Sequence, residues 1–274
     1  MTHETRITLS LAQMDIAVGD PSTNVHRAHA LVAEAARRGS HLILLPELWN
    51  TGYALDQATA LAAPLGEGIF ALVSKWAREH DIWISGSVLE RSQGGFANTA
   101  VLVSPTGDFV GVYRKIHLFG LMDEDRYLQP GDTAAVWDWP WGKVALAVCY
   151  DLRFPELFRH YALLGATFVL LPAEWPASRA HHWRTLVQAR AIENQYFVAA
   201  CNRVGTSKGE TFGGHSMVVS PWGKILVEGG DQEVLLTVTV DLEQTTAARQ
   251  RIPVLRDRRP ETYTALSSTA EVSI

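Results

Sequence analysis

The chain has 274 residues, of which 47% are hydrophobic and 19% are charged, and its net charge at neutral pH is −5. It can bury a large core, and without a stripe of lysine and arginine it offers no footprint for nucleic acid or an anionic membrane. No apolar run approaches the roughly 20 residues that cross a bilayer, and no secretion signal follows Met1. We therefore expect a cytoplasmic protein.

The first half alternates helix-like and strand-like segments. Residues 24–38 and 68–79 have helical periodicity, and residues 82–88 are typical of a strand. The apolar run from His41 to Leu45 predicts a strand that is buried on both faces. Glu47 follows this strand almost directly, so a surface position explains it poorly, although a carboxylate that caps the next turn is the alternative.

A further strand is expected over Phe109 to Tyr113, after a tight turn at residues 105–107. It ends in Arg114 and Lys115. Because side chains alternate along a strand, one of these two cations should point inward.

Cys149 follows the apolar residues 144–148, and the residues after it indicate a turn that opens a helix. A strand-to-helix corner exposes a side chain and leaves backbone N–H groups unpaired, which suits a nucleophile. The alternative is an inert core cysteine, as we expect for Cys201.

The second half repeats the first. Residues 39–49 align with residues 165–175 at a constant offset of 126 (165 − 39), and helices are expected before and after each copy, at 156–164 and 179–195 in the second. A strand at 196–201 and a turn at 221–223 complete the pattern. Two such halves predict two mixed sheets packed face to face, with helices outside.

Three segments resemble, in order and spacing, the signatures of the nitrilase superfamily of carbon-nitrogen hydrolases. They are Pro46-Glu47 with Trp49, Tyr113 to Phe119, and Cys149 to Leu157. The resemblance implies an α/β fold, a four-layer α-β-β-α sandwich with an internal pseudo-two-fold repeat. We expect one domain over residues 1–274, with a C-terminal arm at about 245–274, and a homodimer, because members of this family commonly dimerise.

The resemblance also implies a Glu-Lys-Cys triad. Glu47 would be the general base, Cys149 the nucleophile that forms a thioester, and Lys115 the cation that stabilises the oxyanion. Glu124, before a Pro-Gly pair, would position Lys115. The remaining candidates, for the oxyanion hole or substrate binding, are Tyr150 through its backbone N–H, Trp175, Glu174 and Tyr53.

Several alternatives stay open. His117, two residues after Lys115, permits a Cys-His pair of the papain type. The same thioester could pass its acyl group to an amine or a thiol, which would make an acyltransferase, and a non-catalytic binding module is a further reading. No metal-ligand spacing and no phosphate loop is visible, so we expect no metal and no cofactor.

The small-molecule substrate is expected to be an amide. Tyr150-Asp151 after the cysteine resembles the ω-amidase group, which acts on amides of dicarboxylic or keto acids such as 2-oxoglutaramate, whereas Glu174-Trp175-Pro176 departs from that pattern. A cation among residues 179–184 (Arg179, His181, His182 and Arg184) could hold a substrate carboxylate. Nitriles, N-carbamoyl amines and aryl amides remain alternatives.

Overall fold

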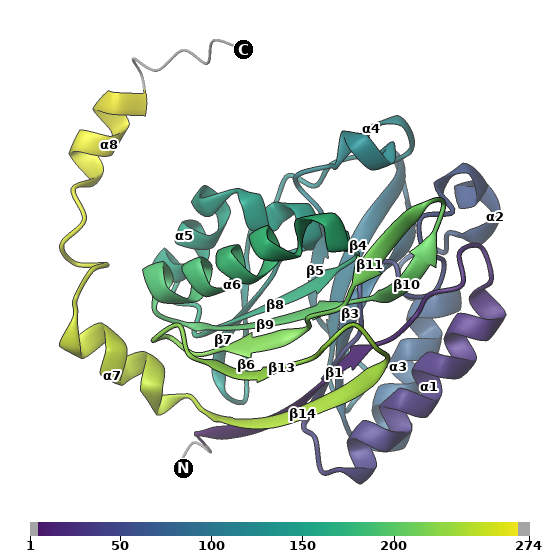
Figure 1. The fold of residues 1–274 in the computed structure, drawn as a ribbon, viewed down its shortest axis with the longest axis horizontal. Helices are drawn as coiled ribbons and strands as arrows, with labels where there is room; N and C mark the ends of the chain where they lie inside the picture. The colour runs from purple at the N-terminus through teal and green to yellow at the C-terminus, as the bar shows by residue number, and fades with distance from the viewer. Residues whose placement is uncertain (1–4, 268–274) are drawn as a thin grey trace.

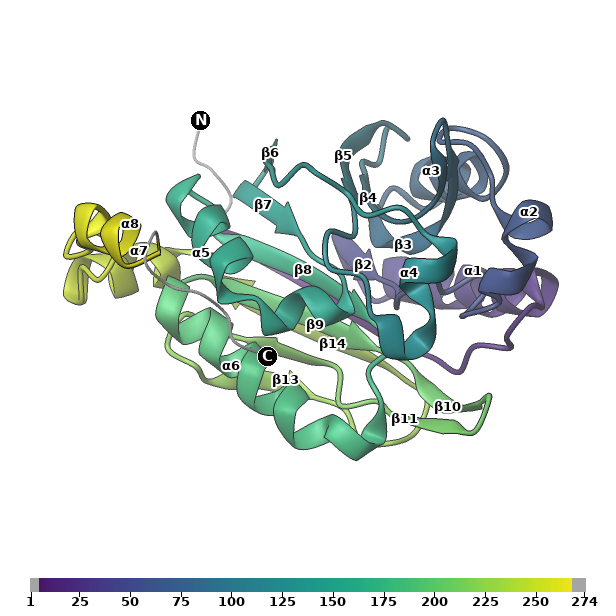
Figure 2. The same cartoon turned by 90° about the horizontal axis from the view of Figure 1, so that it is seen from above.

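A computed structural model describes residues 5–267 (Figures 1 and 2). The first sheet has the strand order β14 (Val234–Asp241), β1 (Arg6–Gln13), β2 (Leu42–Leu44), β3 (Trp83–Ser92), β4 (Gly95–Val103), β5 (Phe109–Arg114). The second has the order β13 (Ile225–Glu228), β12 (Met217–Val219), β9 (Phe197–Asn202), β8 (Phe168–Ala173), β7 (Gly142–Leu146), β6 (Val136–Trp139). A separate hairpin is formed by β10 (Val204–Ser207) and β11 (Glu210–Gly213).

Helices cover the outer faces of both sheets. The pair α1 (Pro21–Arg37) and α3 (Gly68–His80) lies on the first sheet, and the pair α5 (Pro155–Leu163) and α6 (Ala180–Asn194) lies on the second (Figure 2). Shorter helices are α2 (Ala58–Leu61) and α4 (Glu124–Tyr127), and the chain continues into α7 (Glu243–Arg251) and α8 (Pro260–Ser267). The expected four-layer α-β-β-α sandwich is confirmed.

Strand β2 illustrates how the layers are held together. Leu42 and Leu44 belong to the apolar core between the two sheets, whereas Ile43 and Leu45 belong to the core beneath α1 and α3, and all four are fully buried. Alternation along the strand sends successive side chains to opposite faces, so a continuous apolar run serves two cores at once.

The internal repeat is present in the fold. Strands β2 and β8 begin at Leu42 and Phe168, 126 residues apart (168 − 42). Each lies near the centre of its sheet and pairs in parallel with the strands on both sides. The expected turns at 105–107 and 221–223 connect β4 to β5 and β12 to β13. Strand β7 ends at Leu146, before the predicted end at Val148. The backbone N–H of Val148 donates to the Asp151 carboxylate (2.8 Å) instead of to a neighbouring strand.

The C-terminal segment leaves the body of the molecule (Figure 1). Helix α7 is tied to the second half, because the Gln195 side chain donates to the carbonyls of Ala248 and Ile252, at 3.1 and 2.7 Å. Residues 265–274 are rich in serine and threonine, which predicts a frayed end. Helix α8 runs to Ser267, and the rest of that stretch, like residues 1–4, lies outside the described residues. In residues 5–267, every helix is too short or too polar to cross a membrane.

Candidate active site

Glu47 follows the central strand β2 and is completely buried. Its two carboxylate oxygens have separate donors. The Asn98 amide donates to Oε1 at 2.8 Å, and the backbone N–H of Glu174 donates to Oε2 at 2.8 Å. The carboxylate is therefore held from both sheets, and its position is fixed before any substrate arrives.

Lys115 follows β5 and points inward, as alternation along the strand predicted, while Arg114 stays half-exposed and pairs with Glu90. The Lys115 Nζ lies 2.8 Å from Glu47 Oε1 and 2.7 Å from Glu124 Oε1. Burial opposes the charge on the ammonium, but these two carboxylates outweigh it and raise the pKa of Lys115 above its ordinary value. Lys115 is a permanent cation in this site.

Glu124 begins the short helix α4 and is fully buried. Burial raises the pKa of its carboxyl group, although the Lys115 ammonium acts in the opposite direction. The backbone N–H of Phe119 donates to Glu124 Oε2 at 2.6 Å. The Tyr53 hydroxyl lies between the two glutamates, 2.7 Å from Glu124 Oε1 and 3.0 Å from Glu47 Oε1.

Cys149 opens a 3₁₀ helix over Cys149–Arg153, at the strand-to-helix corner that its sequence predicted. Its φ angle is +43°, in the left-handed region that a side chain disfavours, which is typical of strained functional positions. Burial, and next the charge of the Glu47 carboxylate, raise the pKa of Cys149 well above its ordinary value. The resting group is a thiol, so a base must take its proton.

Asp151, which we did not single out from the sequence, joins the cysteine corner to the lysine strand. Its buried carboxylate accepts from the Tyr113 hydroxyl at 2.7 Å and from the backbone N–H of Val148 at 2.8 Å. Tyr113 precedes Lys115 by two residues on β5. An acidic residue two positions after the cysteine was the only signal in the sequence, and its partner Tyr113 lies 38 positions away.

His117 also contacts Asp151, the residue that connects the Cys149 corner to β5. Its Nδ1 lies 2.7 Å from Asp151 Oδ1, and its ring stacks on Phe154 with a centroid separation of 3.6 Å. The imidazole nitrogen that faces the corner is thus engaged by a carboxylate. This geometry favours a supporting role for His117, through Asp151, over a Cys-His pair.

Cys149 lies in the wall of a small pocket. Four further residues predicted from the sequence line it, together with Arg153 and two apolar side chains: Tyr150, Glu174, Trp175, Arg179, Phe119 and Pro176. Tyr53 is different, because it lines a larger depression that does not include Cys149. The structure places its hydroxyl on the carboxylates of Glu47 and Glu124.

Glu174 is buried beside the pocket and pairs with Arg203, whose Nη1 lies 2.9 Å from Oε2. Arg203 also holds Asp15 at 2.9 Å and is itself fully buried. Within residues 5–267, the other carboxylate oxygen, Oε1, has no hydrogen-bond partner. Burial raises the pKa of Glu174 to about 7, against the opposing effect of Arg203.

The chain belongs to the carbon-nitrogen hydrolase family, whose model matches residues 8–250. It is 39% identical to the 2-oxoglutaramate amidase of Bacillus subtilis (strain 168), over 93% of this chain and 99% of that protein. It is 34% identical to the human omega-amidase NIT2, over 94% of this chain and 97% of that protein.

Solved structures of amidases have the same fold as this chain. One is a mutant amidase from Nesterenkonia sp. AN1 that shows covalent addition of the acetamide moiety of fluoroacetamide at its active-site cysteine. It superposes with a TM-score of 0.85 at 29% identity, covering 95% of this chain and 97% of that one. The nitrilase-like fold is therefore established for this chain, and the resemblance found in the sequence is confirmed.

Replacing Tyr53 with phenylalanine tests whether this residue serves the carboxylates or the substrate. We expect Y53F to lower kcat with little change in KM, because the two glutamates lose a shared donor while the pocket keeps its walls. Steady-state assays of ammonia release measure both constants. Y127F, which alters an exposed tyrosine, is the control. A higher KM at unchanged kcat would instead assign Tyr53 to substrate binding.

Proposed function

We propose that the protein is a cysteine-dependent amidase that releases ammonia from small ω-amides of dicarboxylic or keto acids. The observation that carries this proposal is the buried arrangement in which Lys115 contacts both Glu47 and Glu124, while the electrostatic influence of all three groups reaches the Cys149 thiol. The family and its amidase members support the same chemistry.

In the first step, the Cys149 sulfur attacks the amide carbon and Glu47 accepts the thiol proton. A carboxylate close enough to raise the pKa of the thiol suits this transfer, because the thiol is neutral at rest. The negative charge that develops on the carbonyl oxygen is stabilised by the Lys115 ammonium and by the backbone N–H of Tyr150. The first N–H groups of the 3₁₀ helix lack helical acceptors and are free for this purpose.

In the second step, Glu47 returns its proton to the departing nitrogen, and ammonia leaves as the C–N bond breaks. A thioester between Cys149 and the acyl group remains. Glu47, again a carboxylate, takes a proton from water, which attacks the thioester carbon. The C–S bond then breaks, Glu47 returns the proton to the sulfur, and the free acid leaves. Glu124 contacts Lys115 rather than the thiol, so we assign it to positioning the ammonium.

Two arginines in the pocket suit an acidic substrate. Arg153 lies 4.7 Å from the centroid of the Trp175 ring, and Arg179 lies 5.7 Å from the centroid of the Phe119 ring. Within residues 5–267, neither guanidinium has a carboxylate in ion-pair range. Arg184, a candidate from the sequence, pairs with Glu228 instead (3.0 Å). We assign the binding of the distal carboxylate to Arg179 and Arg153.

Glu174 suits the amide end of the proposed substrate. Glu174 lines the same pocket as Cys149, and among the described residues its Oε1 has no hydrogen-bond partner, so we place the NH₂ group of a primary amide beside it. A buried carboxylate that lacks one partner gains most from a donor that the substrate brings. We assign Glu174 to accepting a hydrogen bond from the amide nitrogen, and Trp175 to the apolar wall beside it.

Related reactions are distinguished by a substrate screen. A nitrilase or an N-carbamoyl amine hydrolase would release ammonia from nitriles or carbamoyl compounds rather than from ω-amides. An acyltransferase would yield an acylated amine or thiol in place of the free acid, which product analysis detects. The intact set of acidic, cationic and thiol groups disfavours a binding module without activity.

We further propose that residues 1–274 act as one hydrolase domain with an arm at about 245–274, in a cytoplasmic homodimer. Two features support the dimer: α8 extends away from the body (Figure 1), and Ile252 near the start of the arm is 49% exposed. A reducing compartment would keep Cys149 as a thiol.

Cys149→Ala should abolish ammonia release and leave folding intact, because only the nucleophile is lost. Cys201→Ala is the matched control: Cys201 is fully buried on β9, away from the pocket lining, and its loss should leave the rate largely unchanged. Intact-mass spectrometry should detect an acyl adduct on the wild type and on C201A alone. Equal loss of activity in both variants would point to packing rather than chemistry.

Arg179→Gln should raise KM for the monoamide of a dicarboxylic acid by about 10- to 100-fold, because the charge pair between the half-exposed guanidinium and the substrate carboxylate is lost. A neutral amide of similar length should be affected little, since it brings no carboxylate. R184Q, whose arginine already pairs with Glu228, should behave as the wild type. Equal effects of R179Q on both substrates would contradict carboxylate recognition.

Glu174→Gln should lower kcat/KM at pH 8 by about tenfold, the cost of losing a charged hydrogen-bond acceptor. In the wild type, kcat/KM should fall as the pH drops below about 7, because Glu174 then gains a proton and ceases to accept. Arg203, Glu47 and Lys115 act on this carboxyl group. The decline near pH 7 should be absent in E174Q; an unchanged profile would remove Glu174 from this role.

A further inference from the structure

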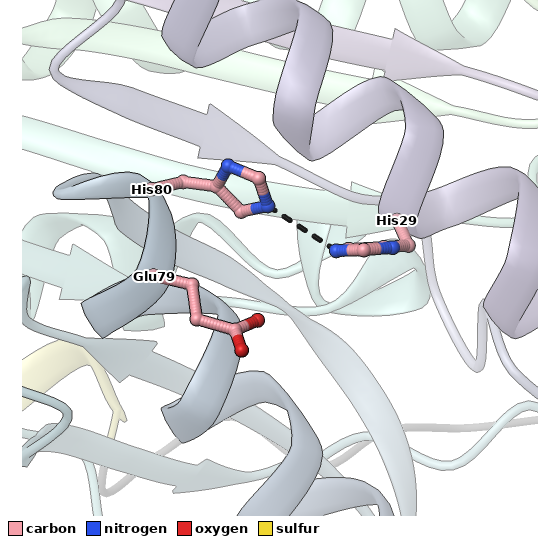
Figure 3. Close-up of side chains that lie close together, drawn as sticks. All are labelled: His29, Glu79 and His80. Carbon is pink, nitrogen blue, oxygen red and sulfur yellow. Dashed lines mark hydrogen bonds between the residues drawn. The ribbon is translucent and has the colours of Figure 1, made fainter.

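Two histidines connect the helices that cover the first sheet. His29 lies in the middle of α1, and His80 is the last residue of α3. Their Nε2 atoms approach to 3.2 Å (Figure 3). Glu79 is adjacent, and the potential ligand atoms of the three residues all lie within 4.8 Å of one another. None of them lines the Cys149 pocket.

The separation of the two nitrogens suits a tetrahedral metal ion. Zinc binds histidine nitrogen at about 2.0–2.1 Å, which places two such ligands about 3.3 Å apart. The observed 3.2 Å therefore needs almost no movement of either ring. The Glu79 carboxylate can approach by rotation of its own exposed side chain, and a water molecule would complete four ligands.

The surroundings favour a cation at this point. The Trp76 ring stacks on His29, with a centroid separation of 4.9 Å and an interplanar angle of 20°, and this contact orients the imidazole. His80 lies in the last turn of α3, where unpaired carbonyl groups attract positive charge. Glu79 lies 3.5 Å from Lys75 in an exposed ion pair, which is weak in water and readily exchanged for a metal.

We propose that His29, His80 and Glu79 form a zinc site that clips α1 to α3. Without the metal, one imidazole donates a hydrogen bond to the other, and zinc would replace that proton between the same two nitrogens. The ion would stabilise the folded protein, because a metal that binds only the native arrangement shifts the unfolding equilibrium. The site is separate from the hydrolytic chemistry and does not depend on it.

Calorimetric titration of metal-free protein with zinc chloride tests the proposal. All variants carry Cys149→Ala, so that the thiol cannot bind the ion. We expect one zinc per chain, and we expect H29A and H80A each to weaken binding by at least about tenfold. H26A is the matched control, because His26 lies one turn earlier on α1 and outside the cluster. E79Q should have a smaller effect than either histidine variant.

Thermal unfolding of the same proteins gives a second readout. Zinc should raise Tm in the C149A background and in H26A, but not in H29A or H80A. Two separate histidine variants keep the result interpretable if one of them folds poorly. Equal zinc affinity in H29A, H80A and H26A, or a Tm that zinc leaves unchanged in the C149A background, would overturn the site.

Discussion

The active site depends on a buried ammonium group that two carboxylates share. Lys115 lies within 2.8 Å of Glu47 and 2.7 Å of Glu124, and all three side chains are inaccessible to water. Burying these charges is costly, and removing one partner of such a pair leaves the others uncompensated, at a cost of about 3–5 kcal/mol. The surplus negative charge is met by fixed donors, among them the Tyr53 hydroxyl and the N–H of Glu174. The site is consequently rigid before substrate binds.

This charge cluster also explains why the surrounding loops take one conformation. Its members come from the ends of β2 and β5 and from the start of α4, and the Asp151 carboxylate joins the cysteine corner to β5 through Tyr113. Segments that would otherwise be mobile are tied by hydrogen bonds to buried charge, which strengthens each bond in a medium of low polarity. Catalytic geometry and loop stability thus have the same physical origin.

Much of the fold and of the site could be predicted from local patterns. Glu47, Lys115 and Cys149 each follow an apolar strand, and alternation predicted that one of Arg114 and Lys115 points inward, which the structure shows to be Lys115. The roles of Asp151, Arg153 and Tyr53 could not be predicted in the same way. Their partners lie on other segments, so that only the packing of the sheets brings them together. Local sequence patterns predict whether a residue lies on a strand, in a turn or on a helix, whereas contacts between distant segments decide which groups its side chain meets.

The two repeats contribute different groups to the candidate site. The position in β8 that corresponds to Glu47 holds Ala173, and the next residue contributes its main-chain N–H to the acid of the other copy. One repeat thus provides the buried acid, and the other provides the backbone donor that fixes its orientation. The pseudo-symmetry of the fold therefore does not extend to the side chains of the candidate site, and within the described residues this acid depends on both halves of the chain.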